Sequence, residues 1–545
     1  MPVPANIILL KNIKISKKMS EERFYIPINL DIEKLEEKYQ EEFKKNGIRI
    51  PQLLFILDSL VQSRILNRDE MEEKEIEFTP LCTTLLDAVV HNYSNYIQFL
   101  LAAQILISDG QYIKGEKCRG FAYNNPYNGK ALMEIKIEDY KLSKALKREK
   151  AKYKIELKEK NKKYHFITKH WDSNKLDIDY FGAYQWIERN AQKEILENEF
   201  GINKTKNKSS ARIVDTAEDR KLMLRRIKDN NYSYGFAGEG NRFYSPITNL
   251  KRELRNFLTY DGKSLVEIDI KNSQPLLSLV LFNPSFWIDR LLDFGKKIKL
   301  KYLLGDVYKD IKNNVKYNNI IMLLKTDINQ YSKEFQLYKS LVLSGKFYEY
   351  IQEHFEPLYP ERFDTLNKVK IEVLRIMFSN PNRHSLSFYK PCITFKKHFP
   401  IVYYLFSFIN SVKDNYLPII LQKIESYLVI DNICKKINEL YPHIPLFTVH
   451  DSIITTKENE AIVADIMRSE IYKRMGYEPQ VKTKGLLPSN VESVQGGNKK
   501  IVNTCTGELF DSIEEITAVH NIKYETLISY LNVKEIASSC WKYAA

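Results

Sequence analysis

Two aspartates, far apart in the chain, each follow an apolar stretch in a pattern that suits metal binding. Asp269 lies near the end of a predicted strand, Leu265–Ile270, and residues 272–275 then break the strand before an apolar helix begins. Asp451 lies at a predicted turn between two apolar strands within residues 445–456. A single aspartate in such a place is most often a turn or cap residue. Two in the same context favour a shared divalent site.

The chemistry that such a pair could perform is phosphoryl transfer. Magnesium prefers a few carboxylates and otherwise keeps water and phosphate oxygens as ligands. Two ions about 3.5–4 Å apart can activate a 3′-hydroxyl and stabilise a departing pyrophosphate. We therefore expect Asp269 and Asp451 to hold two Mg²⁺ ions, with Mn²⁺ as an alternative.

The overall composition indicates a soluble globular protein with a polyanionic partner. A chain of 545 residues is too long for a single core and predicts three or four domains. Hydrophobic residues make up 44% and charged residues 28%, which is typical of globular proteins. The formal net charge of +14 favours nucleic acid as the partner.

The sequence also bears on location. No apolar run reaches the length of a membrane span, so we expect no membrane partner. The first residues lack the pattern of a signal peptide, and the six cysteines lack metal-ligand spacing. These features predict reduced thiols and a cytoplasmic location.

The N-terminal part is predicted to be mainly helical. Residues 1–130 are interpreted as a helical domain that ends in a basic hairpin, and both a winged helix and an ordinary helical bundle fit that pattern. Residues 131–235 form a basic helical connector. Within it, residues 141–163 hold eleven Lys and Arg against three Glu, on a predicted long helix. That helix is either a solvated surface or an arm that follows phosphates.

Two amphipathic helices and a final strand, residues 480–486, accompany the two aspartates. The predicted helix 368–379 places Lys370 and Phe378 near one face. On the helix 417–427, Gln422 and Glu425 are i, i+3 neighbours. Residues 488–500 are a predicted linker. Residues 501–545 form a separate small module, predicted to contain two short helices joined by a tight turn.

In this order, the motifs resemble those of the family A DNA polymerases, the bacterial DNA polymerase I type. The segment from Asn241 and Arg242 to Arg255 resembles the stretch that precedes motif A, and Asp269 begins a motif A-like segment. The helix with Lys370 resembles motif B, and His450 with Asp451 resembles motif C. The resemblance covers roughly residues 236–487. The C-terminal module is similar to the helix-turn-helix repeats attached to homing endonucleases.

The resemblance implies an α/β (α+β) fold and a set of residue roles. Residues 236–487 would form a right-hand polymerase palm with an antiparallel sheet and helical fingers, preceded by a helical, partly thumb-like region and followed by a small helix-turn-helix. The implied partners are a DNA primer-template, with an RNA template as an alternative, and nucleoside triphosphates. The implied catalytic residues are Asp269, Asp451 and Lys370; those near the nucleotide are Gln274, Phe378 and Arg375; those along the primer-template are Arg242, Arg252, Arg255, Gln422 and His450.

Several residues depart from the family pattern. Gln274 stands where the family has a glutamate that helps to exclude ribose, which leaves sugar selection open. Ser452 stands where the family usually has a glutamate, and His-Asp-Ser is instead similar to single-subunit phage-type RNA polymerases. Leu366 replaces an arginine one turn before Lys370. No set of exonuclease carboxylates is found upstream, so no proofreading domain is expected.

Three hypotheses follow. The first is a DNA-dependent DNA polymerase that extends a primer 3′-end by two-metal-ion catalysis, from a phage or mobile element. The second is an RNA-synthesising enzyme, a primase or a single-subunit RNA polymerase, favoured by Ser452 and Gln274. The third is a DNA-binding replication protein without catalysis. The intact Asp269, Asp451 and Lys370 count against the third hypothesis.

Overall fold

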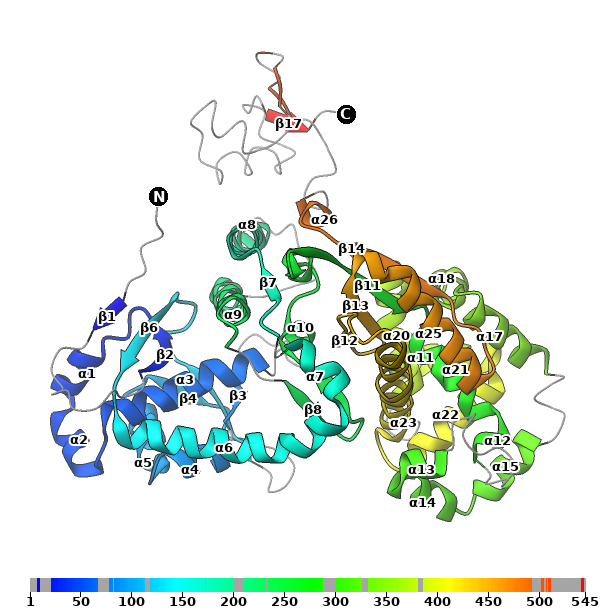
Figure 1. Cartoon of the computed structure of the whole chain (residues 1–545), viewed down its shortest axis with the longest axis horizontal. Coiled ribbons are helices and arrows are strands. Elements are labelled where there is room, and N and C mark those ends of the chain that lie inside the picture. The colour runs from blue at the N-terminus through cyan, green and yellow to red at the C-terminus, as the bar shows by residue number, and fades with distance from the viewer. Residues whose placement is uncertain are drawn as a thin grey trace.

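The computed structural model shows a mixed α/β chain in which helices outnumber strands (Figure 1). It describes residues 7–9, 21–66, 78–81, 83–112, 118–171, 173–199, 209–231, 234–287, 300–325, 332–380, 386–492, 501–503, 506, 508–510 and 541–543. In these ranges, every helix is too short or too polar to cross a membrane.

The centre of the C-terminal half is an antiparallel sheet. Its strands lie in the order β12 (Phe447–Val449), β13 (Ser452–Thr456), β11 (Lys263–Ile270), β10 (Leu258–Tyr260) and β7 (Leu176–Ile178), and β14 (Val481–Leu486) also pairs with β11. All these pairings are antiparallel. The strands predicted around both aspartates and at residues 480–486 are therefore confirmed. β7 comes from the predicted connector, so that region contributes to this sheet.

Strand alternation divides the residues of β11 between two faces. Val266, Ile268 and Ile270 point to one side and are fully buried, whereas Glu267 and Asp269 point to the other. The helix α25 (Glu460–Met475) packs on the sheet and contacts β11, β13 and β14. On the polar side of β11, Glu267 is buried and Asp269 is partly exposed.

A helical region lies between β11 and β12 in the sequence and forms the right-hand part of Figure 1. Aromatic side chains fill its interior, such as Phe282 and Phe335, whose ring centres are 5.0 Å apart. It begins with the short helix α11 (Ser273–Ser278) and ends with α23 (Tyr416–Ser426), which continues through a π-helical stretch, Tyr427–Cys434, into α24 (Lys435–Leu440). The helices between them are α12 (Pro284–Trp287), α13 (Leu300–Leu304), α14 (Asp306–Asn313), α15 (Tyr317–Lys325), α17 (Lys333–Leu343), α18 (Phe347–Phe355), α19 (Pro360–Phe363), α20 (Leu366–Phe378), α21 (Leu386–His398) and α22 (Pro400–Val412).

The N-terminal part contains two small sheets besides its helices. The strand β6 (Leu132–Ile137) pairs with β2 (Glu22–Pro27) and β1 (Ile7–Leu9). The predicted hairpin is β4 (Leu106–Ser108) and β5 (Gly120–Tyr123), and β3 (Thr79–Pro80) adds to it. The β4–β5 hairpin was predicted, whereas the sheet of β1, β6 and β2 was not. The predicted boundary at residue 130 falls just before β6, which pairs with β2. The helices are α1 (Ile32–Lys38), α2 (Gln40–Asn46), α3 (Ile50–Leu66), α4 (Thr83–Val89) and α5 (Tyr93–Ala102).

The basic connector contains the predicted long helix, α6 (Tyr140–Lys163), which runs along the N-terminal part in Figure 1. It is followed by α7 (His165–Trp171), α8 (Tyr180–Glu199) and α9 (Ser210–Lys228). A hairpin, β8 (Gly235–Ala237) and β9 (Arg242–Tyr244), then leads into α10 (Pro246–Asn249) and a 3-10 turn, Leu254–Phe257.

The C-terminal region is described only in part. The predicted linker begins with a one-turn helix, α26 (Ser489–Glu492). Beyond it, β15 (Ile501–Asn503) lies between β16 (Leu509–Phe510) and β17 (Trp541–Tyr543). The predicted pair of helices falls on residues 511–540, which lie outside the described residues.

A buried ion pair joins α9 to α3. The Arg64 guanidinium donates to both carboxylate oxygens of Asp219 at 2.8 Å, and it lies 3.3 Å from Asp215. The Asp219 side chain is completely buried. The connector is thereby fixed to the N-terminal helices.

We expect Arg64→Ala to destabilise this part of the protein by about 3–5 kcal/mol, because the substitution removes the guanidinium that pairs with the buried carboxylate of Asp219. Urea unfolding followed by circular dichroism measures the change. Lys309→Ala removes one partner of an exposed pair with Asp306 and serves as the control, with little expected effect. Equal stabilities of Arg64→Ala and wild type would contradict this role of the buried pair.

Candidate functional site

The pairing of β11 with β13 brings Asp269 and Asp451 together. Ile268 pairs with Ile453, and the next residue of β11 is Asp269. Val449 pairs with Ser452, so His450 and Asp451 form the two-residue turn between β12 and β13. His450 has φ of 55°, in the left-handed region that such tight turns require. The two aspartates therefore lie at the same end of neighbouring strands, and both are partly exposed.

The two carboxyl groups affect each other electrostatically. Burial, followed by the charges of Asp451 and Glu267, raises the pKa of Asp269 to about 7, and the charge of Arg252 opposes this shift. Burial, followed by the charge of Glu425, raises the pKa of Asp451 to about 6. A cluster of carboxylates disfavours its own ionisation, so a cation here would be stabilising.

Glu267 is a member of this acidic cluster that our sequence analysis did not single out. It is buried, and its Oε1 lies 3.3 Å from Nη1 of Arg255. The hydroxyl of Ser452 donates to the same oxygen at 3.1 Å. Alternation along the strand could have identified it, since residues i and i+2 of a strand share a face. Ser452 and Arg255 thus meet at Glu267, behind the two aspartates.

A second buried carboxylate, Glu425 on α23, links two predicted site residues. Its Oε2 accepts from Nη2 of Arg242 at 2.8 Å and from Nε2 of Gln274 at 2.9 Å. Glu425 is 1% exposed. Arg242 from β9 and Gln274 from α11 are thus held at one point beside Asp451, although only Gln422 of this helix was predicted as a site residue.

The helix α20 approaches the site through Tyr348 of α18. The Lys370 ammonium lies 5.7 Å from the centre of the Tyr348 ring. Burial, together with the negative charge of Asp451, raises the pKa of Tyr348. Lys370 is exposed, and Phe378 at the end of α20 is half-buried. A single tyrosine thus connects the predicted lysine with the predicted aspartate.

Two other predicted residues have different surroundings. Arg375 is exposed and pairs with Glu372 at 2.9 Å on its own helix. Five residues of helix turn it about 140° away from Lys370, so these two residues do not share a face. Gln422 packs against the β8–β9 hairpin, because a Cβ on Gly240 would lie 2.7 Å from it.

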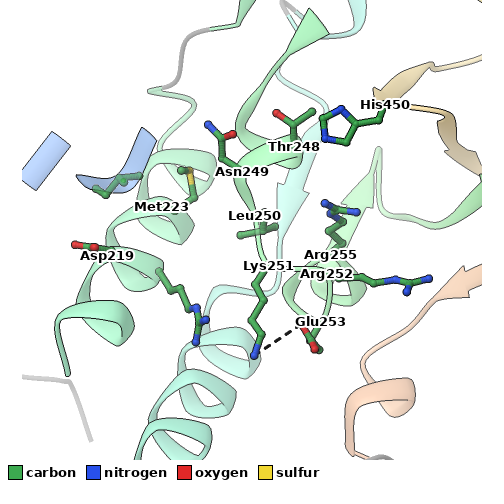
Figure 2. Close-up of a pocket in the computed structure, with 12 residues that line it drawn as sticks. Asp219, Met223, Thr248, Asn249, Leu250, Lys251, Arg252, Glu253, Arg255 and His450 are labelled. Atoms are coloured by element: carbon green, nitrogen blue, oxygen red, sulfur yellow. Dashed lines mark ion pairs between the residues drawn. The ribbon is translucent and has the colours of Figure 1, made fainter. Parts of the chain in front are cut away.

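Figure 2 shows a pocket of about 240 Å³. It lies close to the acidic cluster, because its lining includes Arg255, which pairs with Glu267, and His450, the chain neighbour of Asp451. Arg252 and Arg255 line it from the segment after α10, and His450 reaches it from the turn between β12 and β13. Burial and the nearby charges of Arg242 and Arg255 lower the pKa of His450 to about 4, so its ring is neutral at pH 7. The remaining lining residues are Ile65, Asp219, Arg220, Met223, Thr248, Asn249, Leu250, Lys251 and Glu253.

Arginine and lysine side chains outnumber aspartate and glutamate side chains in the lining of this pocket. Glu253 lies 3.9 Å from Lys251, and Asp219 is engaged by Arg64. Arg252 is exposed. The pocket is therefore suited to an anionic group such as a phosphate.

Asp269 and Asp451 are the metal ligands that the sequence predicted. Among the residues that the structure describes, there is no group of three or more His, Cys, Asp and Glu side chains arranged to hold a metal ion. Asp269 and Asp451 could supply two carboxylates, and any further ligands would have to come from water or substrate.

Comparison with known proteins gives no match to a family model and none to a curated protein. Among solved structures, the chain is similar to the polymerase domain of Pol1 from M. smegmatis, in complex with DNA primer-template and dNTP. The TM-score is 0.27 and the sequence identity 8%, over 60% of this chain and 70% of that chain.

We expect Asp269→Asn to stabilise the metal-free protein at pH 8 and to have no such effect at pH 4. The pKa of Asp269 is about 7 in the fold against an ordinary 3.8, so the folded state binds more protons between these values and stability falls as pH rises. Removing the charge should recover about 1–3 kcal/mol above pH 7. Unfolding midpoints with a chelator at both pH values measure this.

Asp261→Asn is the control for that experiment. Lys175 lowers the pKa of Asp261, so its substitution should not stabilise the protein at pH 8. An Asp269→Asn variant that is no more stable than wild type at pH 8 would show that the acidic cluster is not under electrostatic strain.

Proposed function

We propose that this chain is a template-directed nucleotidyltransferase, and in its most specific form a DNA-dependent DNA polymerase of family A type that extends a primer 3′-end. The observation that carries the proposal is the juxtaposition of Asp269 and Asp451 at one end of neighbouring antiparallel strands. Their sequence contexts resemble motifs A and C, and the helix with Lys370 approaches the same place through Tyr348.

The two aspartates fit divalent cations. Both are partly exposed, and the pKa of each is raised by burial and by neighbouring acids, a situation that bound cations would relieve. We assign two Mg²⁺ ions to Asp269 and Asp451, with Mn²⁺ as an alternative. When bound, the ions would activate the primer 3′-hydroxyl and stabilise the charge of the leaving pyrophosphate.

The other residues of the site are proposed to bind the substrates. Lys370 supplies positive charge for the triphosphate, with Phe378 near the sugar and template base. The pocket lined by Arg252, Arg255 and His450 takes phosphates of the primer-template. His450 contributes as a neutral ring, because its pKa is near 4. We propose that Arg375 contacts the nucleotide only from the edge of the site.

Arg242 is proposed to follow the minor groove together with Gln422. Its guanidinium lies 2.8 Å from Glu425, so it is already ordered before DNA binds. Gln422 is located one turn before Glu425 on α23, against the β8–β9 hairpin that carries Arg242. The two side chains therefore belong to one packed unit.

RNA synthesis is the second candidate function. It is favoured by Ser452, whose hydroxyl bonds to Glu267, and by Gln274 at the position where the polymerase family has an acid. A binding protein without catalysis has less support, because such a protein would have no use for two carboxylates whose mutual repulsion weakens the fold.

We expect Asp269→Asn or Asp451→Asn to abolish nucleotide addition while leaving primer-template binding nearly unchanged. Each carboxylate is a proposed metal ligand, whereas the cationic surfaces that bind DNA remain. Extension of a labelled primer measures activity on DNA and RNA templates, with dNTPs and NTPs offered separately. Fluorescence anisotropy measures binding.

The outcomes separate the hypotheses. Extension with dNTPs identifies a DNA polymerase, and products from NTPs identify the RNA-synthesising alternative. Activity that survives either substitution would exclude the two-metal assignment. Tight DNA binding with no synthesis for any combination of template and nucleotide would favour the hypothesis of a DNA-binding protein without catalysis.

Lys370→Ala should lower kcat/KM for the nucleotide by about a hundredfold, because the triphosphate loses a charge-assisted contact. Steady-state kinetics at varied nucleotide concentration measures this. Lys38→Ala is the matched control, since Lys38 also lies over a tyrosine ring, at 4.9 Å from Tyr39, on the distant helix α1. Equal kcat/KM values of the two variants would show that Lys370 does not contact the nucleotide.

A further inference from the structure

The hydrogen bonds of Glu425 connect residues from three separate segments. Its Oε2 accepts from Arg242 on β9 and from Gln274 on α11, while Glu425 itself belongs to α23. Within the described residues, its second oxygen is buried and accepts no hydrogen bond. Burying a carboxylate costs free energy unless the group is paired and hydrogen-bonded, and Glu425 is only 1% exposed.

The acceptor character of Glu425 determines how the amide of Gln274 is oriented. Burial raises the pKa of Glu425, but the Arg242 guanidinium, 2.8 Å away, opposes this and favours the ionised carboxylate. An ionised carboxylate can only accept hydrogen bonds, so it must take the NH₂ end of the amide. The Nε2 of Gln274 is indeed 2.9 Å from Oε2. The carbonyl oxygen of Gln274 is then the end left for another partner, and a neutral residue at position 425 would not impose this choice.

Gln274 lies near the two aspartates, because it follows Asp269 by five residues and bonds to Glu425, whose charge acts on Asp451. It lies in the first turn of α11, which begins directly after the turn that ends β11, and it is half-buried. Under the proposed function, a nucleotide held near Asp269 would bring its sugar next to this amide. A fixed acceptor there distinguishes a sugar with one more hydroxyl from one without it.

We propose that Glu425 is a positioning residue for sugar selection: by fixing the amide of Gln274, it sets the discrimination between dNTPs and NTPs. This inference rests on the proposed nucleotidyltransferase function. Glu425 does not touch the reacting atoms and acts through the Gln274 side chain that it holds.

The test compares selectivity in Glu425→Gln with that in wild type. The ratio of kcat/KM for dNTP to kcat/KM for NTP should move toward one by about tenfold, because the unfixed amide can present either end to the sugar. Glu134→Gln is the matched control. Glu134 is also a buried glutamate 2.8 Å from an arginine, Arg225, but it belongs to the N-terminal sheet, so the ratio should not change.

A second variant tests the mechanism even if Glu425→Gln folds poorly. Gln274→Ala should give the same loss of selectivity. The double variant should lose no more selectivity than either single variant, because both substitutions act through the amide of Gln274. Additive losses would overturn the proposed route through Gln274. An unchanged ratio in either single variant would overturn the inference.

Failure of the inference is distinguishable from failure of the proposed function. If wild-type protein with Mg²⁺ adds neither dNTPs nor NTPs to a primer, the proposed function itself is excluded. Wild-type protein that adds nucleotides, with a ratio insensitive to position 425, would leave the function in place and exclude only the role of Glu425.

Discussion

The repulsion between the carboxylates of Asp269 and Asp451 is the constraint on which the arrangement around the site depends. Strand pairing holds the two acids at the same end of the sheet, and two further acids, Glu267 and Glu425, lie behind them. The neighbouring arginines offset this charge: Arg255 pairs with Glu267, Arg242 pairs with Glu425, and Arg252 lowers the pKa of Asp269. The buried acids are therefore neutralised, whereas the two partly exposed acids are left to be neutralised by a cation.

Local sequence patterns predicted the elements of the site well. Apolar residues ended by polar breakers predicted β11 and the β12–β13 turn, and helical periodicity predicted α20 and α23. The pairing of Ile268 with Ile453 could not be derived from periodicity, because it joins strands separated by the whole helical region. The similar contexts of the two aspartates and the order of the motifs predicted a shared site, but not this pairing. Glu267 was accessible from strand alternation, whereas the contacts of Glu425 depend on tertiary packing.

The N-terminal part was predicted less completely for the same physical reason. Its helices have recognisable apolar spacing, but β2 pairs with β6 from more than a hundred positions later, and β1 is a strand of three residues. Such short strands carry little periodic signal. The attachment of α9 to α3 depends on Arg64 and Asp219, two charged residues that a sequence pattern would assign to the surface.

The position of β11 between strands that come much later in the chain has a consequence for synthesis on the ribosome. β11 ends at Ile270, but its long partners are β13, at residues 452–456, and β14, at residues 481–486. The intervening helices emerge first and must close as a large loop before the sheet can assemble. The nascent chain therefore cannot bring the two aspartates together until nearly all of it has left the exit tunnel, so partial translation products lack the assembled site.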